Sequence, residues 1–548
     1  MSVFFDTPTS DNTVAAGAVE SLLTDIGITE GISSAESAQY HQLLAAVHGV
    51  AEHVLQLPDY LIDADDEKYP REQVHRPTQE EQNFGHAWAH KFLIRGKVNA
   101  SLLQGKTVCL KDNIAVKGVP QFFGTGKTHV ADAIPPWTPQ ADATVVRRVL
   151  EAGADIVGTT TCENFCNSTS SFTSAQGTVR NPYSPDYSAG GSTSGGCAVV
   201  GGGLVDIAIG ADQGGSIRVP SSFCGCVGFK PTHGLVPYTG ISSSDAINDH
   251  AGPIARSVGD VAACLDAISG RDDYDDRTLG APLHGSSQYS RRLQPSVAGM
   301  KIGILTEGME HDLIAENVRA AVMKGAHAFT ELGATVQHVS LPIHLEGPAI
   351  WTIQQRIAGT LSMLGYAHGR RGLFSTAYEA ARQPWTDESF QKLFPSTKNT
   401  IINGLSLLKS YPGLYAKTMN IAQLQRDSYE KLFQQYDLII MPTTPFVAPR
   451  NMEWKQGDSP MSALTPSMGI TLNTAIFDVT GHPALSLPVG FASPTGDASI
   501  KLPVGMQIVG GLWQEQKILN AAYAWERAFD WKKFYFESGY GSDSLTRL

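Results

Sequence analysis

The sequence lacks an uninterrupted apolar run of the roughly 18 to 20 residues that are needed to cross a bilayer, and it lacks a clustered basic patch. Its start, MSVFFDTPTSDNTVAAGAVESLL, also lacks the basic region and the apolar stretch of a secretory signal. With 41 basic and 53 acidic residues, the chain has a net charge of -12, which disfavours binding to nucleic acid or to an anionic membrane. We therefore expect a cytoplasmic protein with neither partner.

The seven cysteines include no Cys-x-x-Cys pair, and their odd number favours reduced thiols over a disulfide framework. Cys162 and Cys166 would lie one turn apart in a helix, and Cys224 and Cys226 would share one face of a strand. Either pair could supply zinc ligands, but no second Cys or His pair stands at the spacing of a zinc finger. We interpret both pairs as small buried thiols and expect no metal site.

The chain is long enough, at 548 residues, for one large core with insertions or for two to four smaller units. Residues 1–95 carry apolar side chains at helical intervals, such as Leu43, Leu44 and Val47, and show no strand alternation. They predict a helical N-terminal layer. Strand, helix and strand patterns then follow one another at 107–111, 142–152 and 155–158, and again at 301–305, 318–332 and 335–341. The region 96–344 therefore predicts an α/β sheet covered by helices.

Strand signals vanish between residues 345 and 436, where helical periodicity returns. This pattern predicts an inserted helical subdomain or lid. Strand-like runs resume at 437–441, 484–489 and 504–509, so we expect residues 437–548 to rejoin the main sheet.

The segment from Ala189 to Pro231 is rich in glycine and holds two glycine-flanked serines, Ser192 and Ser216, which are 24 residues apart. A serine hydroxyl attacks a carbonyl only if a base removes its proton and if donors receive the developing oxyanion. The run from Gln213 to Ser216 can supply such donors, because successive glycines allow backbone N–H groups to converge.

Particular residues disfavour two other functions of a glycine-rich loop, phosphate binding and the nucleophile elbow of an α/β-hydrolase. A phosphate-binding loop has a glycine five residues before its Gly-Lys-Thr run. Gln121 occupies that position before the run at 126–128, and Ala100 occupies it before the run at 105–107. Neither serine lies in a Gly-x-Ser-x-Gly elbow, since Ser192 is followed two places on by Ser194 and Ser216 by Arg218. Nucleotide binding and an α/β-hydrolase triad are therefore disfavoured.

The motifs GGSTSGG and GADQGGSIRVPSSFCGCVGFKPTHG resemble the amidase signature. The resemblance continues in VCLKDNIAVKGVP, IIMPTTP, NTAIFDVTGHPALSLPVG and LPVGMQIVG, so it covers residues 105–270 densely and 300–525 more sparsely. The runs DQGGSIR, GLVPYTG and DVTGHP are most similar to the amidases that are encoded beside nitrile hydratases. The family implies a central mixed β-sheet covered by helices.

Carried over by motif, the resemblance implies Ser216 as the nucleophile, Ser192 after a cis peptide as the proton relay, and Lys111 as the base. Gly191, which precedes Ser192, has no side chain to obstruct that geometry. Lys111 ends an apolar strand, where burial would favour the uncharged amine; the alternative is a solvated anchor. Thr193 and Ser194 offer rival hydroxyls, for which the alternative is loop hydrogen bonding.

The resemblance also places the oxyanion hole at the backbone N–H groups of Gln213, Gly214, Gly215 and Ser216. Asp212 and Arg218 would brace this loop, with a plain surface ion pair as the alternative. We interpret His482, between Gly481 and Pro483, as a hydrogen-bonded corner and not as a base. Cys224 is interpreted as a packed thiol and not as a second nucleophile.

These assignments predict an amidase that hydrolyses carboxamides to a carboxylic acid and ammonia or an amine through an acyl-enzyme, with no cofactor. We expect a small-molecule substrate, a homodimer, and an acyl pocket lined by parts of 162–172, the inserted helical region and 468–477. Three alternatives remain open. They are a carbamate, urea or anilide hydrolase, the ammonia-producing component of a tRNA-dependent amidotransferase, and a non-catalytic scaffold.

Overall fold

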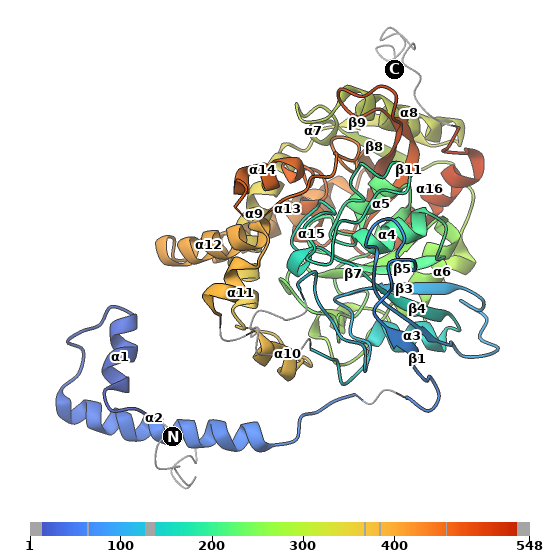
Figure 1. The fold of residues 1–548 in the computed structure, drawn as a ribbon. Helices are drawn as coiled ribbons and strands as arrows, with labels where there is room; N and C mark the ends of the chain where they lie inside the picture. Colours follow the sequence, from blue (N-terminus) through green and yellow to red (C-terminus); the bar gives the residue numbers. More distant parts are fainter. Residues whose placement is uncertain are drawn as a thin grey trace. The chain divides into compact units, whose positions relative to one another are not determined.

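The computed structural model describes residues 14–62, 65–126, 137–366, 369–382, 385–455 and 457–533. The chain separates into two compact units, Met1–Ile62 and Asp63–Leu548 (Figure 1). The first unit holds α1 (Ala18–Asp25) and α2 (Ser34–Gln56). A capping box begins α2, because the Ser33 hydroxyl accepts from the Glu36 N–H while the Glu36 carboxylate accepts from the Ser33 N–H.

The described part of the second unit is built on one mixed sheet of twelve strands. In chain order these are β1 (Glu72–His75), β2 (Trp88–Ile94), β3 (Thr107–Lys111), β4 (Asp155–Thr160), β5 (Ile207–Asp212), β6 (Val227–Lys230), β7 (His250–Ala255), β8 (Lys301–Leu305), β9 (Thr335–Val339), β10 (Leu438–Pro442), β11 (Ala484–Ala492) and β12 (Leu502–Gly510). Their order across the sheet is β1-β2-β4-β3-β5-β7-β6-β11-β12-β10-β8-β9. Strand β3 runs parallel to β4 and β5, whereas β7, β11 and β12 pair antiparallel with their neighbours. The predicted α/β class with a mixed sheet is confirmed.

The helical prediction for residues 1–95 is wrong for their last third, where β1 and β2 lie. Strand β2 pairs with β4 and is buried on both faces, with Trp88 and Ile94 at 2% and 0% exposure. A strand that is covered on both faces does not alternate apolar with polar residues, so the pattern used to detect strands was missing here.

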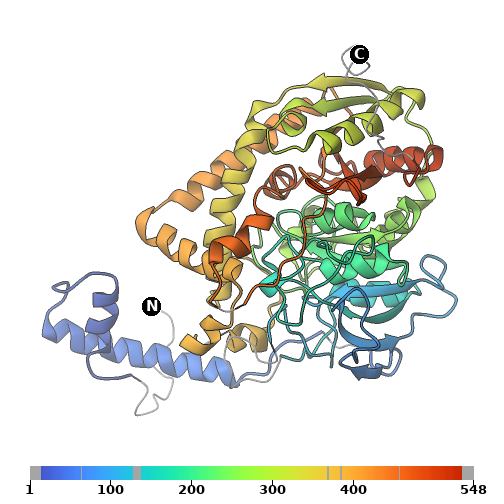
Figure 2. The same cartoon turned by 45° about the horizontal axis from the view of Figure 1, so that its top comes forward.

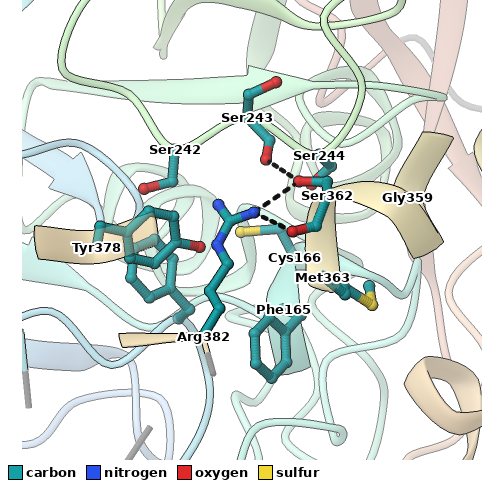
Figure 3. Close-up of a pocket in the computed structure, with 11 residues that line it drawn as sticks. Phe165, Cys166, Ser242, Ser243, Ser244, Gly359, Ser362, Met363, Tyr378 and Arg382 are labelled. Atoms are coloured by element: carbon teal, nitrogen blue, oxygen red, sulfur yellow. Dashed lines mark hydrogen bonds between the residues drawn. The ribbon is translucent and has the colours of Figure 1, made fainter. Parts of the chain in front are cut away.

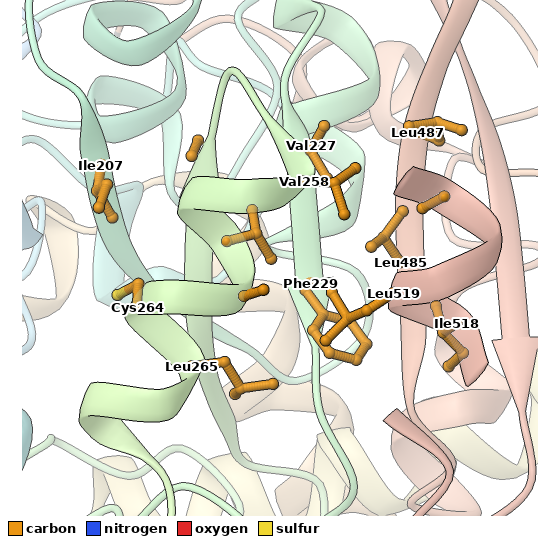
Figure 4. Close-up of a cluster of buried hydrophobic side chains, with 14 of the residues drawn as sticks. Ile207, Val227, Phe229, Val258, Cys264, Leu265, Leu485, Leu487, Ile518 and Leu519 are labelled. Carbon is orange, nitrogen blue, oxygen red and sulfur yellow. The ribbon is translucent and has the colours of Figure 1, made fainter. Parts of the chain in front are cut away.

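Helices cover both faces of the sheet. In chain order those of the second unit are α3 (Thr144–Glu151), α4 (Ser194–Gly201), α5 (Arg218–Cys224), α6 (Val258–Ile268), α7 (Thr306–Met309), α8 (Glu316–Glu331), α9 (Gly347–Met363), α10 (Thr376–Ala381), α11 (Asp387–Gln391), α12 (Pro395–Ser410), α13 (Leu414–Leu432), α14 (Pro460–Leu464), α15 (Ala475–Val479) and α16 (Glu515–Ala528). Figure 4 shows α6 and α16 packing on β6 and β11, where Phe229, Leu485 and Leu519 are fully buried. A separate cluster, formed by Cys109 of β3, Ala208 of β5 and residues 197–200 of α4, lies on the opposite face.

The segment 345–436 contains helices α9 to α13, and its described residues contain no strand. Figure 2 shows these yellow and orange helices grouped together beside the sheet. Helix α9 packs against α12, α13 and α15, so it connects this segment to the chain that leads into β11.

Candidate active site

Lys111 is the last residue of β3, and its direction follows from strand alternation. Val108 and Leu110 enter the main core cluster, so Cys109 and Lys111 point to the other face, where α4 lies. Lys111 is completely buried. Its Nζ donates to Ser192 Oγ at 2.8 Å and to the Ala211 carbonyl at 3.3 Å. The interpretation of Lys111 as a solvated anchor is therefore wrong.

Ser192 lies just before α4, and the Gly191–Ser192 peptide bond is cis, as the resemblance implies. The two rival hydroxyls have other partners. Thr193 Oγ1 donates to the Ala211 carbonyl at 3.4 Å, and Ser194 Oγ donates to Glu163 Oε1 at 2.7 Å. Of the three neighbouring hydroxyls, the geometry joins only Ser192 to the lysine.

Ser216 lies in the turn between β5 and α5 and is 8% exposed. The Thr193 N–H donates to the Ser216 carbonyl at 3.3 Å, which holds the two serine-bearing segments together. Within the described part of the chain, the Ser216 hydroxyl has no hydrogen-bond partner. The structure thus brings Ser216 beside the segment of Ser192, but no hydrogen bond joins its hydroxyl to Ser192 or to Lys111 within the described residues.

The carboxylate of Asp212 organises the turn that carries Ser216. Its Oδ1 accepts from the Gly215 N–H at 2.6 Å, and its Oδ2 accepts from the Ile217 N–H at 3.0 Å. Gly215 has φ 139°, and a Cβ there would lie 2.5 Å from Thr474 Oγ1, so this turn requires glycine.

Of the four backbone N–H groups predicted as oxyanion donors, that of Gly215 already has another acceptor. The Gly215 N–H is occupied by Asp212, so it does not face a substrate. The N–H groups of Gln213, Gly214 and Ser216 have no acceptor within the described part of the chain. Buried backbone N–H groups rarely lack a partner, so these three are available to an oxygen of a bound ligand.

Two side chains that the sequence did not single out fix the carbonyl groups of the same turn. Trp351 of α9 donates from Nε1 to the Gln213 carbonyl at 2.6 Å, and Thr474 donates from Oγ1 to the Gly214 carbonyl at 2.7 Å. A Cβ on Gly214 would lie 2.5 Å from the Trp351 ring. Trp351 lies outside every quoted motif, whereas Thr474 falls in the run NTAIFDVTGHP, which gave no role to its hydroxyl.

Asp212 and Arg218 form a completely buried ion pair, so the interpretation as a surface pair is wrong. Arg218 donates from Nε to Asp212 Oδ2 at 3.0 Å and from Nη2 to Asp212 Oδ1 at 2.9 Å. Burial alone would raise the pKa of Asp212, but the Arg218 charge and its hydrogen bonds hold that pKa well below its usual range. The loop is thus braced by a permanently charged pair.

Asp478 completes this cluster, although the sequence analysis did not single it out. Its Oδ2 accepts from Arg218 Nη2 at 2.5 Å, and both side chains are fully buried. Burial, followed by repulsion from Asp212, raises the pKa of Asp478 well above its usual value. Arg218 also donates to the Thr474 carbonyl and to Gln507 Oε1, both at 2.9 Å, so it joins β5, α15 and β12.

Two further interpretations are confirmed. His482 is buried, with Nδ1 2.8 Å from Thr480 Oγ1 and Nε2 3.0 Å from Glu430 Oε1, as expected for a hydrogen-bonded corner. Cys224 is buried, and burial raises the pKa of its thiol. The strand expected for Cys224 and Cys226 is wrong, because Cys224 ends α5 and Gly225, at φ 65°, reverses the chain before β6.

A small pocket, which Cys166 lines, opens near Lys111 (Figure 3). Its lining includes the aromatic and sulfur-containing side chains of Phe165, Cys166, Met363 and Tyr378, the guanidinium of Arg382, which lies over the Tyr378 ring, and the serines at 242–244 and 362. Residues of 162–172 and of the helical region 345–436 line this pocket. The segment 468–477 contributes no residue to this pocket.

The described residues contain no cluster of three or more His, Cys, Asp or Glu side chains arranged to hold a metal ion. They also contain no helix that is long and apolar enough to cross a membrane.

Residues 87–519 match the family model described as Amidase. An enantioselective amidase of Rhodococcus rhodochrous is 35% identical over 433 residues, which cover 78% of this chain and 80% of that protein. The A subunit of the glutamyl-tRNA(Gln) amidotransferase of Moorella thermoacetica is 36% identical over 439 residues, which cover 79% and 84%. A solved peptide amidase in complex with chymostatin has a TM-score of 0.62 and 27% identity, with 78% and 83% of the chains covered. This chain therefore belongs to the amidase signature family of C–N hydrolases.

Proposed function

We propose that this protein hydrolyses carboxamides, with Ser216 as the nucleophile, Ser192 as the proton relay and Lys111 as the base. The observation that carries the proposal is the buried hydrogen bond of 2.8 Å from Lys111 Nζ to Ser192 Oγ, next to the turn of Ser216. No carboxylate pairs with Lys111 within the described part of the chain, and its Nζ is directed to Ser192 and to the Ala211 carbonyl.

In the proposed reaction, the Ser216 hydroxyl rotates toward Ser192 and attacks the amide carbonyl. Its proton passes to Ser192 Oγ while the Ser192 proton passes to an uncharged Lys111. The carbonyl oxygen is received by the free N–H groups of Gln213, Gly214 and Ser216. Collapse of the tetrahedral intermediate returns a proton through the same relay to the leaving nitrogen. Water then cleaves the acyl group from Ser216.

The pocket in Figure 3 is the proposed acyl site. It adjoins the proposed reaction centre at Cys166, which lines the pocket and interacts with Lys111. Its aromatic and sulfur-containing wall favours an apolar or aromatic acyl group. We propose that residues 345–436, which supply much of this wall, act as an inserted subdomain that selects substrates. Rates on acetamide, benzamide and ethyl carbamate would separate aliphatic, aromatic and carbamate substrates.

Replacement of the proposed nucleophile and base tests the mechanism. We expect Ser216→Ala and Lys111→Ala to abolish amide hydrolysis while the far-ultraviolet circular dichroism stays unchanged. Lys106→Ala is the matched control, because Lys106 precedes β3 at its other end and pairs with Asp260 at the surface. Substantial hydrolysis by either purified site variant contradicts the mechanism.

The relatives that are named as components of a glutamyl-tRNA(Gln) amidotransferase favour a second candidate. In that case the same serine would release ammonia for another component of a tRNA-dependent amidotransferase. Hydrolysis of simple amides by the isolated chain supports the amidase, whereas activity that requires a copurifying partner supports the second candidate. Labelling of Ser216 by a fluorophosphonate, in competition with substrate, distinguishes either enzyme from a scaffold. Sedimentation of the full chain tests the expected homodimer.

A further inference from the structure

Cys166 differs from the six other cysteines of the chain in its exposure. All seven thiols are free; Cys166 is partly exposed, and the others are buried. Its side chain lines the pocket of Figure 3. A small reagent that enters this pocket therefore reaches Cys166 first.

A second thiol lies directly beside it. Cys166 Sγ is 3.7 Å from Cys162 Sγ, and a disulfide bond of about 2.05 Å requires the two atoms to approach by only roughly 1.6 Å. The pair depends on an unusual turn at η2 (Asn164–Cys166), where Phe165 and Cys166 have φ 50° and 55°. Left-handed backbone is rare for such residues, so the surrounding structure must hold this turn.

The turn is held by two backbone hydrogen bonds of 2.7 Å, from the Phe165 N–H to the Phe123 carbonyl and from the Cys166 N–H to the Glu163 carbonyl. These bonds fix the segment between Cys162 and Cys166 on both sides. The thiols are therefore presented to each other by the fold and not by chance side-chain rotation.

The electrostatic surroundings give the two thiols different roles. The hydrogen bond to Cys162 lowers the pKa of Cys166 against the opposing effect of burial. Burial raises the pKa of Cys162 well above its usual value. Because the thiolate is the reactive form, Cys166 is the thiol that attacks and Cys162 the thiol that follows.

The other closely spaced cysteines lack these properties. Cys224 and Cys226 are fully buried, burial raises the pKa of each, and both donate to backbone carbonyls. Burial also raises the pKa of Cys264, which lies in the main core cluster. These thiols stay protonated and out of contact with the pocket, so they serve as internal controls.

We infer that Cys166 and Cys162 form an oxidisable pair beside the reaction centre that is closed by small hydroperoxides. The Cys166 thiolate attacks the peroxide oxygen, the O–O bond breaks, and a sulfenic acid forms with release of water or an alcohol. Cys162 then attacks the sulfenic sulfur, its proton leaves with the hydroxyl group as water, and a disulfide forms. For hydrogen peroxide, two thiols and one peroxide give one disulfide and two waters.

Closure of this disulfide affects the reaction centre because the two cysteines flank Glu163. The Glu163 N–H donates to the Ser192 carbonyl at 3.4 Å, and its carboxylate accepts from Ser194 Oγ at 2.7 Å. A shift of the segment 162–166 therefore moves the chain that carries Ser192. Oxidation is expected to inactivate amide hydrolysis reversibly.

Peptide mapping tests the chemistry independently of activity. No Lys or Arg lies between Arg148 and Arg180, so trypsin releases both cysteines in one peptide, 149–180. After treatment of the reduced full-length protein with stoichiometric hydrogen peroxide and alkylation, this peptide should have lost two hydrogens and carry no alkyl group. Dithiothreitol should restore both alkylation sites and the activity. A peptide that is alkylated at both cysteines after peroxide treatment overturns the inference.

Variants separate the two roles. In Cys162→Ser, Cys166 should stop at the sulfenic acid and be trapped by dimedone, whereas Cys166→Ser should slow peroxide inactivation by at least about tenfold. Cys264→Ser is the matched control and should lose activity to peroxide as fast as the unaltered protein. If Cys264→Ser is protected, or if Cys166→Ser is inactivated at the unaltered rate, the pair is not the site of oxidation.

Discussion

Replacement of Asp212 by asparagine tests whether the buried carboxylate positions the oxyanion donors. Asparagine has nearly the same shape but no charge, and only one of its two terminal atoms accepts hydrogen bonds. Asp212 now accepts from three backbone N–H groups, those of Gly215, Ile217 and Arg218, and from two atoms of the Arg218 side chain. The amide –NH₂ of asparagine would face some of these donors with another donor.

The expected loss of stability follows from the burial of the pair. Removing one partner of a buried ion pair typically costs about 3 to 5 kcal/mol. Arg218 keeps Asp478, Gln507 and the Thr474 carbonyl, so we expect a loss near 3 kcal/mol, at the lower end of that range. The loss of even one oriented donor typically lowers kcat by about 10² to 10³. Asp212→Asn should therefore lower both the free energy of unfolding and kcat.

Urea unfolding and steady-state kinetics on one amide measure the two effects. Because the folded-state pKa of Asp212 is lowered, its ionisation stabilises the fold at pH values above about 3.9, the usual pKa, and this contribution is lost as the pH falls below it. The stability difference between the two proteins should therefore be full at pH 7 and shrink in acid. Asp206→Asn, at the other end of β5, is the control and should leave kcat unchanged. A stable Asp212→Asn protein with unaltered kcat would refute the reasoning.

Four further substitutions, two of them at residues in contact, give separate readouts. Gly214→Ala should lower kcat by about 10² or more, because the alanine Cβ would lie 2.5 Å from the Trp351 ring. Adding Trp351→Phe to this variant should recover part of the lost kcat, because the smaller ring relieves the contact. Burial raises the pKa of Glu163 to about 7, so the free energy of unfolding should fall as the pH rises from about 4.5 to 7. Glu163→Gln should remove this pH dependence from the thermal unfolding temperature. Arg382 has an unpartnered, buried Nε at the pocket, so Arg382→Gln should raise KM more for an amide with a distal carboxylate than for benzamide. Equal changes in KM for both amides would contradict a role in substrate binding.

Much of the fold could be predicted where a strand is short, apolar and bounded by turns. The predicted strands at 107–111 and 301–305 coincide with β3 and β8. The order of strands could not be predicted, because β5 and β7, which are adjacent, are separated by α5 and β6 in the sequence. Strands β6 and β7 were not predicted either; both are buried along their whole length and so show no alternation.

In the candidate site, too, some residues could be predicted from the sequence and others could not. Lys111, Ser192 and Ser216 could be named because they fall in recognisable motifs, and burial of the Lys111–Ser192 contact agrees with the expected chemistry. The occupied N–H of Gly215 could not be foreseen, since it depends on the side-chain orientation of Asp212. Trp351 and Thr474 could not be found from spacing, because they act on the turn from 138 and 260 residues away.

These distant contacts link substrate selection to the chemical step. Helix α9 carries Trp351, which holds the Gln213 carbonyl, and further along it carries Met363, which lines the pocket. In the proposed reaction, an acyl group that packs against Met363 would therefore press on the same helix that positions a proposed oxyanion donor. Since a peptide group turns as a unit, fixing the carbonyl of Gln213 also fixes the direction of the Gly214 N–H. Acyl groups that fit the pocket poorly should therefore lower kcat as well as raise KM, because they disturb a donor that is needed only when the carbonyl oxygen becomes charged.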